Sequence, residues 1–276
     1  MSAQRQVSEP FDTDRFLAAT PAFTLAHLRR AMRDPSPSAV RSWVKYHASA
    51  GRVKVLERGL YATVPPGTDA DRFVVDPFLG AAAVRSDCVF GYHAALELLG
   101  AAHSVAHLLG VFTARRRRPL TVGNVRVEFT PHPAPLVRRR ATLSGVREVR
   151  YRGAMLHATS AERTLLDGFR NPRLVGGLEE LVQSAAGLPS LDLVSLRDLL
   201  EAYNQRFLWA ATGWFLERYR RAFRVTEQDL SQLERHRPAS PHYLPRRARG
   251  KGGTLLPRWN LILPETLLTL SEPSEA

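Results

Sequence analysis

The sequence contains very little cysteine and no long apolar run. Cys88 is the single cysteine, so the chain cannot form an internal disulfide or a zinc site built from several thiolates. We interpret it as a small buried residue near the start of a strand. No apolar run reaches the length of a membrane span, and the polar N-terminus lacks the apolar core of a signal peptide. We therefore expect a cytoplasmic protein that binds no membrane.

The common catalytic motifs are also missing. No segment fits the Walker A loop, the dinucleotide-binding glycine pattern, the esterase nucleophile elbow or the metalloprotease His-Glu-x-x-His pattern. His103 and His107 are four residues apart, as in some metal sites, but nothing nearby supplies a thiolate or a helical carboxylate. We therefore expect a protein that is not an enzyme and has no catalytic residues, cofactor or metal.

Positive charge is abundant. The chain has 39 basic and 26 acidic residues and a net charge of +13, and only three of the basic residues are lysine. Residues 1–66 contribute +5 and the remainder +8, so a polyanion can contact both parts. Such contacts give affinity and salt sensitivity but no sequence choice. The arginine runs at 115–118 and 138–140 fit either solvated turns or a patch for nucleic acid or a partner.

Two short helices are predicted before residue 34. Phe11, Phe16 and Leu17 indicate the first. Thr24 is placed to cap the second by accepting a free backbone amide. Apolar residues then recur on one side of that second helix, at Leu25, Leu28 and Met32. Residues 34–37, Asp-Pro-Ser-Pro, favour a turn that leads to a third helix.

The third helix is predicted over residues 38–49, with Ser36 or Ser38 placed to cap it. One face is apolar and carries Val40, Trp43, Val44 and His47 at helical spacing. The opposite face carries hydroxyls and cations and no acid: Ser38, Arg41, Ser42, Lys45 and Ser49. A buried anchor behind such a face fits the DNA major groove. We predict that Arg41 and Ser42 reach base edges, that Lys45 reads a base or grips phosphate, and that Ser38 lies beside them.

A β-hairpin is predicted after Gly51, which is placed to end the third helix. Residues 52–56 and 60–64 alternate like strands around a turn at 57–59, and Pro65-Pro66 closes the module. Helices followed by a hairpin predict a winged helix-turn-helix DNA-binding domain over residues 1–66, in which Arg52, Lys54 and Arg58 hold the DNA backbone or minor groove. The alternative is a helix and hairpin that only pack on a larger domain.

The rest of the chain, residues 67–276, is predicted to form a larger mixed α+β domain, because strands come first and helices after. The predicted helices are residues 76–85 and 92–99 and most of 160–235, and the predicted strands are 108–112, 120–122, 125–129, a hairpin over 146–156, and 259–263. Residues 238–253 are predicted to be a loop.

The segment from Thr159 to Asp167 is the sharpest local pattern in this second domain. Thr159 and Glu162 fit a capping box at a helix start. Charged side chains then lie at helical spacing and are expected to form ion pairs. Together with the glycine-rich loop 249–253, this segment is a candidate interaction surface, formed by Glu162, Arg163, Asp167, Arg249 and Lys251.

The order of these motifs resembles the AbiEi-type antitoxins of bacterial AbiE (type IV) abortive-infection toxin–antitoxin systems, including their mycobacterial relatives. The likeness spans nearly the whole chain, and the order and spacing of the motifs are more specific than any one of them. It is carried by the N-terminal module ending Glu-Arg-Gly-Leu-Tyr61, by Tyr92–Gly100, by Ser160–Asp167 with Gly176-Gly177, by Thr212–Glu217 and by Arg258–Leu261.

The resemblance implies two roles in phage defence. The first domain would bind double-stranded DNA at inverted repeats in its own promoter and repress the operon. The second would neutralise a cognate nucleotidyltransferase-like toxin, directly or indirectly. The candidate interaction surface in residues 162–167 and 249–253 would then be its antitoxin surface. Two alternatives remain open. One is an atypical kinase-like enzyme that modifies the toxin, using the polar groups of residues 162–167 and 249–253. The other is a lone transcriptional regulator.

Overall fold

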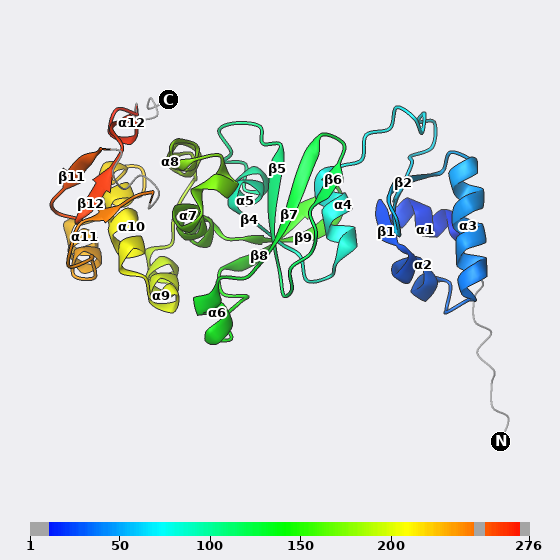
Figure 1. The fold of residues 1–276 in the computed structure, drawn as a ribbon, viewed down its shortest axis with the longest axis horizontal. Helices are drawn as coiled ribbons and strands as arrows, with labels where there is room; N and C mark the ends of the chain where they lie inside the picture. The colour runs from blue at the N-terminus through cyan, green and yellow to red at the C-terminus, as the bar shows by residue number, and fades with distance from the viewer. Residues whose placement is uncertain (1–10, 246–251, 271–276) are drawn as a thin grey trace, which may run out of the picture. The chain divides into compact units, whose positions relative to one another are not determined.

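The computed structural model describes residues 11–245 and 252–270 and divides into two compact units (Figure 1). Unit 1 comprises residues 1–86 with 121–124, and unit 2 comprises residues 87–120 and 125–276. Helices and three separate sheets make up the fold, so the predicted mixed α+β class is confirmed. Within the described part of the chain, no helix has both the length and the apolar character of a membrane span.

Unit 1 begins with three helices and a small antiparallel sheet. The elements are α1 (Thr13–Ala19), β1 (Ala22–Thr24), α2 (Leu25–Ala31), α3 (Pro37–Ser49), β2 (Val53–Glu57) and β3 (Leu60–Thr63). The three strands pair in the order β1-β3-β2. Thr24 accepts a hydrogen bond from the amide of His27 at 3.2 Å, which confirms the predicted cap of α2. Phe23 and Leu28 are fully buried at the centre of this core.

Unit 1 continues past the predicted boundary at residue 66, because the next segment folds back onto it. Lys54 donates from Nζ to the carbonyl oxygens of Asp71 and Phe73, at 3.2 and 2.7 Å, and so ties residues 71–73 to β2. Helix α4 (Pro77–Val84) then begins at its Asp76 cap and packs on β1 and β3. The structural division therefore falls at Ser86.

A six-stranded sheet dominates the middle of the chain (Figure 1). Its strands are β4 (Val89–Gly91), β5 (Leu108–Thr113), β6 (Leu120–Val122), β7 (Val125–Pro131), β8 (Val146–Tyr151) and β9 (Ala154–Thr159). They follow the order β6-β7-β5-β4-β9-β8. Parallel pairing joins β5 to β7 and β4 to β9, whereas β8 and β9 form an antiparallel hairpin at one edge. This confirms the predicted strands and hairpin to within a few residues.

Helices of unit 2 surround a large apolar core. They are α5 (Tyr92–Leu98), α6 (Ala134–Arg138), α7 (Ala161–Arg170), a 3-10 turn at Pro172–Val175, α8 (Leu178–Ala186), α9 (Leu193–Tyr203), α10 (Arg206–Arg218), α11 (Glu227–Glu234) and α12 (Glu265–Leu268). A second small sheet contains β10 (His242–Tyr243), β12 (Leu261–Leu263) and β11 (Thr254–Leu256). The segment 238–253 is therefore not entirely a loop, because β10 pairs parallel with β12.

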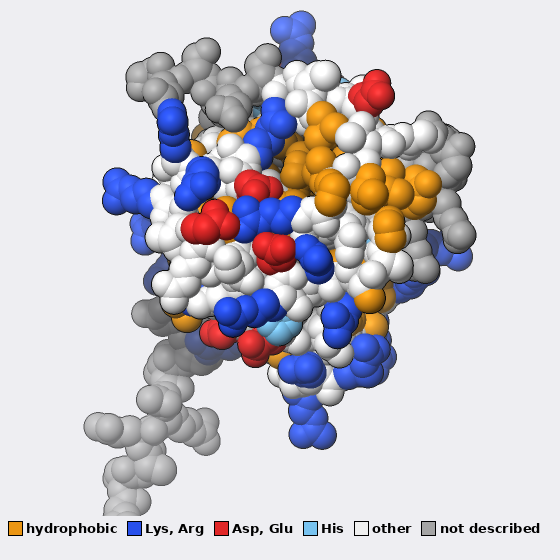
Figure 2. Space-filling model, turned by 90° about the vertical axis from the view of Figure 1, so that its left-hand side faces the viewer, with side chains coloured by type: hydrophobic (Ala, Val, Ile, Leu, Met, Phe, Trp, Pro, Cys, Tyr) orange, Lys and Arg blue, Asp and Glu red, His pale blue; other side chains and the backbone are white. Residues whose placement is uncertain are grey.

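The C-terminal Arg258-Trp259 pair is built into this unit. The Trp259 ring packs on Gly213 of α10, and its Nε1 donates to Glu217 at 2.5 Å. Arg258 forms ion pairs with Glu217, Glu227 and Glu234. Figure 2 shows acidic and basic side chains alternating across the middle of this face. The positive charge of Arg258 is balanced by these glutamates, so the Arg258-Trp259 pair stabilises the fold of unit 2.

Candidate nucleic-acid interface

Helix α3 is fixed at its start by a serine cap and along its length by apolar side chains. The Ser36 hydroxyl accepts a hydrogen bond from the amide of Ala39 at 3.2 Å, so Ser36 rather than Ser38 caps the helix. Val40, Val44 and His47 are buried on the inner face, as the spacing predicts. One face of α3 is thus committed to the core, and the opposite face is left to solvent.

Trp43 sets the rotation of α3 against unit 1. Its indole Nε1 donates to the Thr13 hydroxyl at 3.1 Å, and its ring lies 6.1 Å from those of Phe16 and Phe23 and 4.2 Å from His47. Burial, followed by the nearby Arg52 charge, lowers the pKa of His47, so the neutral imidazole is the form that packs here. This aromatic cluster gives α3 a rigid base.

The outward row predicted on α3 is exposed along its whole length. It contains Ser38, Arg41, Ser42, Lys45 and Ser49, and no acidic residue occurs in the helix. Among the described residues, no carboxylate forms an ion pair with Arg41 or Lys45. Ser38 is the one member with a side-chain contact to a neighbour, since its hydroxyl lies 3.0 Å from that of Ser36. The row therefore presents cations and hydroxyls with their hydrogen-bonding capacity directed outward.

The hairpin residues of the predicted interface are of two kinds. Arg58 is exposed at the tip between β2 and β3, where Gly59 takes up a positive φ of 86°. Arg52 and Lys54 are half-buried, and they already have partners within unit 1. Arg52 pairs with Asp14, and Lys54 holds the carbonyls of residues 71 and 73. Arg58 is thus exposed for contact with DNA, whereas Arg52 and Lys54 hold segments of unit 1 together.

Tyr46 belongs to the exposed side of α3 and was not among the predicted DNA-binding residues. Its side chain is 68% exposed, and it lies four residues after Ser42 and three before Ser49. Helical spacing alone places these three on neighbouring turns of one side. A phenol hydroxyl can donate to a phosphate oxygen, so Tyr46 extends the candidate interface.

The predicted antitoxin surface on α7 is wrong for three of its residues. Arg163 and Asp167 are 0% exposed and Glu162 is 9% exposed. The capping box is also absent, because Ser160 caps the helix and Glu162 instead accepts the amide of Asp192 at 2.8 Å. The physical reason is that α7 lies inside unit 2, in contact with α5, α8, α9 and α10. Arg249 and Lys251 lie outside the described residues.

The buried charges of α7 form a satisfied network. Arg163 donates from Nη1 to the carbonyls of Thr142 and Ser144, both at 2.7 Å, and its Nε lies 3.4 Å from Asp167. The Tyr203 hydroxyl donates to Asp167 at 2.7 Å. Burial raises the pKa of Asp167, although the two neighbouring arginines and Tyr203 act against this. Each charge has a partner, so the network organises the core.

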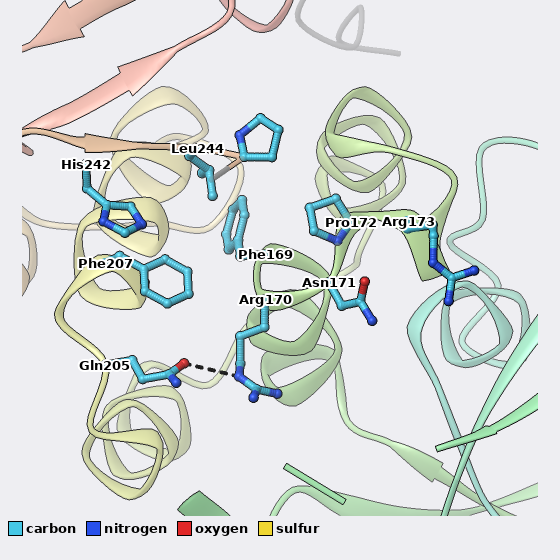
Figure 3. A pocket seen from close by; sticks show the side chains of 10 residues that line it. Phe169, Arg170, Asn171, Pro172, Arg173, Gln205, Phe207, His242 and Leu244 are labelled. Atoms are coloured by element: carbon cyan, nitrogen blue, oxygen red, sulfur yellow. Dashed lines mark hydrogen bonds between the residues drawn. The ribbon is translucent and has the colours of Figure 1, made fainter. Parts of the chain in front are cut away.

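A cavity of about 590 Å³ opens beside this network in unit 2. Figure 3 shows Phe207 and His242 on one side and Arg170 and Asn171 on the other. Arg170 donates to Gln205 at 3.1 Å and pairs with Asp167, the carboxylate that it shares with Arg163. The described lining residues include no carboxylate, hydroxyl or thiol. Elsewhere in the described chain, no cluster of His, Cys, Asp and Glu has the arrangement of a metal site.

Comparisons with known proteins bear on the fold alone. No protein-family model matches the chain, and a search of curated proteins finds no match. Among solved structures, the chain is similar to the Rv2827c protein from Mycobacterium tuberculosis, with a TM-score of 0.59 and 18% sequence identity. The similarity covers 91% of this chain and 89% of that one, so it extends over both units. A mycobacterial protein thus shares the overall fold, in keeping with the mycobacterial side of the family resemblance.

Proposed function

We propose that unit 1 is a winged helix-turn-helix that binds double-stranded DNA, with α3 as the recognition helix. The order α1-β1-α2-α3-β2-β3 and the sheet order β1-β3-β2 support this assignment. Helix α2, the turn at 32–36 and α3 form the helix-turn-helix, and the β2–β3 hairpin with Arg58 at its tip forms the wing. This assignment makes α3 the element that enters the major groove.

The observation that carries the proposal is the exposed row of residues on α3, which contains no acid. The opposite face of the helix packs against the core of unit 1. Arg41 has the geometry to read guanine through two parallel hydrogen bonds, and Ser42 can bond to either kind of base edge. Lys45 and Tyr46 lie within one turn of these residues and fit base or phosphate contacts. A rigid helix that offers such groups is suited to sequence-specific binding.

We further propose that the chain is the antitoxin of a toxin–antitoxin pair and represses its own operon from inverted repeats. Under this proposal unit 2 neutralises a nucleotidyltransferase-like toxin in the cytoplasm without an enzymatic step of its own. The kinase-like alternative loses support at residues 162–167, because Arg163 and Asp167 are buried and paired with each other and Glu162 is buried and holds the Asp192 amide. Co-expression with the product of the neighbouring reading frame tests this part: unchanged toxicity in cells that contain the full-length protein would count against it.

The DNA proposal is tested by replacing Arg41 with alanine. We expect Arg41→Ala to lose about tenfold to hundredfold in affinity for the chain's own promoter, since a good bidentate base contact is worth about 1–3 kcal/mol. Affinity for random duplex should fall much less. Arg72→Ala is the matched control, because Arg72 is a 90% exposed arginine of unit 1 that lies outside α3 and the hairpin. Fluorescence anisotropy measures both DNAs, and equal losses on the two would remove Arg41 from the reading role.

A further inference from the structure

Strand β8 forms an open edge of the large sheet. It ends the strand order, and among the described residues it pairs with β9 alone (Figure 1). The Ser160 amide donates to the Gly145 carbonyl at 2.7 Å. This bond determines which residues of β8 direct their backbone groups toward β9, since such residues alternate along the strand. Backbone groups of Arg147 and Val149 therefore face β9, and those of Glu148 and Arg150 face outward. An edge of this kind is a template for another strand.

The surface around this edge carries arginines that pair with no carboxylate of the described residues. Arg147 and Arg150 are exposed on β8 itself, and three more exposed arginines, Arg138, Arg139 and Arg140, precede it in the chain by a short loop. Within the described parts of the chain, none of the five forms an ion pair. Glu148 is the only acid between Glu128 and Glu162 in the sequence. The contrast with the compensated cluster around Arg258 indicates that this charge is available to a partner.

Apolar side chains are exposed among these arginines. Val137 is 50% exposed, Leu143 is 68% exposed and Met155 is 52% exposed. Met155 lies directly opposite Arg150 across the β8–β9 pair, so the two side chains share one face. Leu143 lies in the loop whose carbonyls, at residues 142 and 144, are held by the buried Arg163. The buried Arg163 side chain therefore fixes the loop that carries Leu143.

We propose that the outer edge of β8 and its five arginines bind an acidic, extended segment of a protein partner by strand addition. Main-chain hydrogen bonds to the edge would give affinity, and acidic side chains would pair with the arginines. A DNA backbone can accept hydrogen bonds from the edge amides but has no donor for the edge carbonyls. A second copy is also unsuitable, since β8 against β8 would place arginines beside arginines. The inference goes beyond the proposed function and does not depend on DNA binding by unit 1.

The first test uses a synthetic peptide of alternating glutamate and valine on the full chain. Its control is the same sequence N-methylated at every residue, which keeps the charge and removes the backbone donors from both edges of the peptide. We expect the unmodified peptide to bind about tenfold or more tightly than the methylated one, as isothermal titration calorimetry measures directly. Equal binding of both peptides, or displacement of the bound peptide by random duplex DNA, would reduce the surface to a nonspecific cationic patch and overturn the proposal.

The second test changes the protein. Glu148→Pro removes an outward-facing backbone donor at an edge position where proline is tolerated, and Glu148→Gln removes the same negative charge while it keeps the donor. We expect peptide binding to weaken about tenfold in Glu148→Pro and to hold or improve in Glu148→Gln. The double variant Arg147→Glu/Arg150→Glu should also lose binding, whereas Arg221→Glu, an exposed arginine of unit 2, should not. Thermal melts confirm that each variant is folded. Equal affinity in the proline and glutamine variants would refute strand addition.

Discussion

At Arg163 the chain places a full positive charge at a site with no solvent exposure. Such a charge is costly unless every donor finds an acceptor. Two backbone carbonyls, the Asp167 carboxylate and the His132 ring provide these acceptors. The guanidinium also lies over the Phe112 ring, 5.3 Å from its centroid. A lysine in this place has no planar fork with which to reach all of these groups at once.

His132 should make stability depend on pH. Burial, followed by the Arg163 charge, lowers the pKa of His132 from its ordinary 6.5 to about 4. The unfolded chain therefore takes up a proton near pH 6.5 that the folded chain refuses until about pH 4. This contribution to stability is fully present above pH 6.5 and is lost as the pH falls toward 4.

Urea unfolding at a series of pH values checks this prediction. We expect the free energy of unfolding of the parent chain to fall more steeply between pH 6.5 and 4 than that of His132→Gln. His157→Gln is the control for the loss of a histidine elsewhere in the sheet, since His157 has a half-exposed side chain on β9. Parallel curves for the parent and His132→Gln would show that His132 titrates normally in the fold.

Individual residues could be assigned from the sequence where their role is local. Helical spacing correctly predicted which side chains of α3 are buried and which are exposed, because the 3.6-residue period of apolar residues can be read from the sequence. The same reasoning failed for Glu162 and Asp167, since an ion pair at helical spacing has the same sequence pattern whether solvent or core surrounds it. Lys54 was likewise beyond prediction, because its acceptors at residues 71 and 73 approach only after the chain folds back.

At the scale of elements, α10 shows how one glycine allows two segments to meet. A Cβ added at Gly213 would lie 2.1 Å from the Trp259 ring, which is 1% exposed. The ring cannot retreat easily, because its Nε1 is bonded to Glu217. Gly187, at the end of α8, differs in that an added Cβ would meet nothing closer than 3.4 Å, and its φ of −81° suits any residue.

These two glycines should respond oppositely to alanine. We expect Gly213→Ala to destabilise the chain by about 1–3 kcal/mol through overpacking against Trp259. Gly187→Ala should stabilise it by about 0.4–1 kcal/mol, because the unfolded chain loses freedom and the folded chain gains no clash. Chemical denaturation of both variants beside the parent measures the difference. A neutral Gly213→Ala would mean that α10 and Trp259 separate at little cost.

Element prediction succeeded where alternation or a cap extends over several residues. The strand at 125–129, the hairpin at 146–156 and the Asp76-capped helix are examples. Strands β10 and β11 and helix α12 contain two to four residues each, which is too short for a period to show. That β8 lies at an edge was also hidden, because the parallel pairing of β4 with β9 is a long-range contact.

At the scale of the molecule, the net charge of +13 is not one uniform field. Part of it is cancelled in ion-pair clusters such as that around Arg258. Two of the regions whose basic residues form no ion pair among the described residues are the proposed binding surfaces. One is the outward row of α3 in unit 1. The other is the arginine surface beside β8 in unit 2. These regions differ in form, since the first is a rigid helix and the second an open strand edge with exposed apolar groups.

Two regions of different form should bind different polyanions independently. Arg41→Ala should therefore weaken promoter binding and leave affinity for the acidic peptide unchanged, and Arg147→Glu/Arg150→Glu should do the reverse. A triple variant should show both losses at full size, because effects at independent sites add. Titrations of promoter DNA and peptide against the same four proteins at one salt concentration test this. If charge reversal on β8 reduces promoter affinity as much as Arg41→Ala does, both regions contact a single nucleic acid, and the division of roles between the units fails.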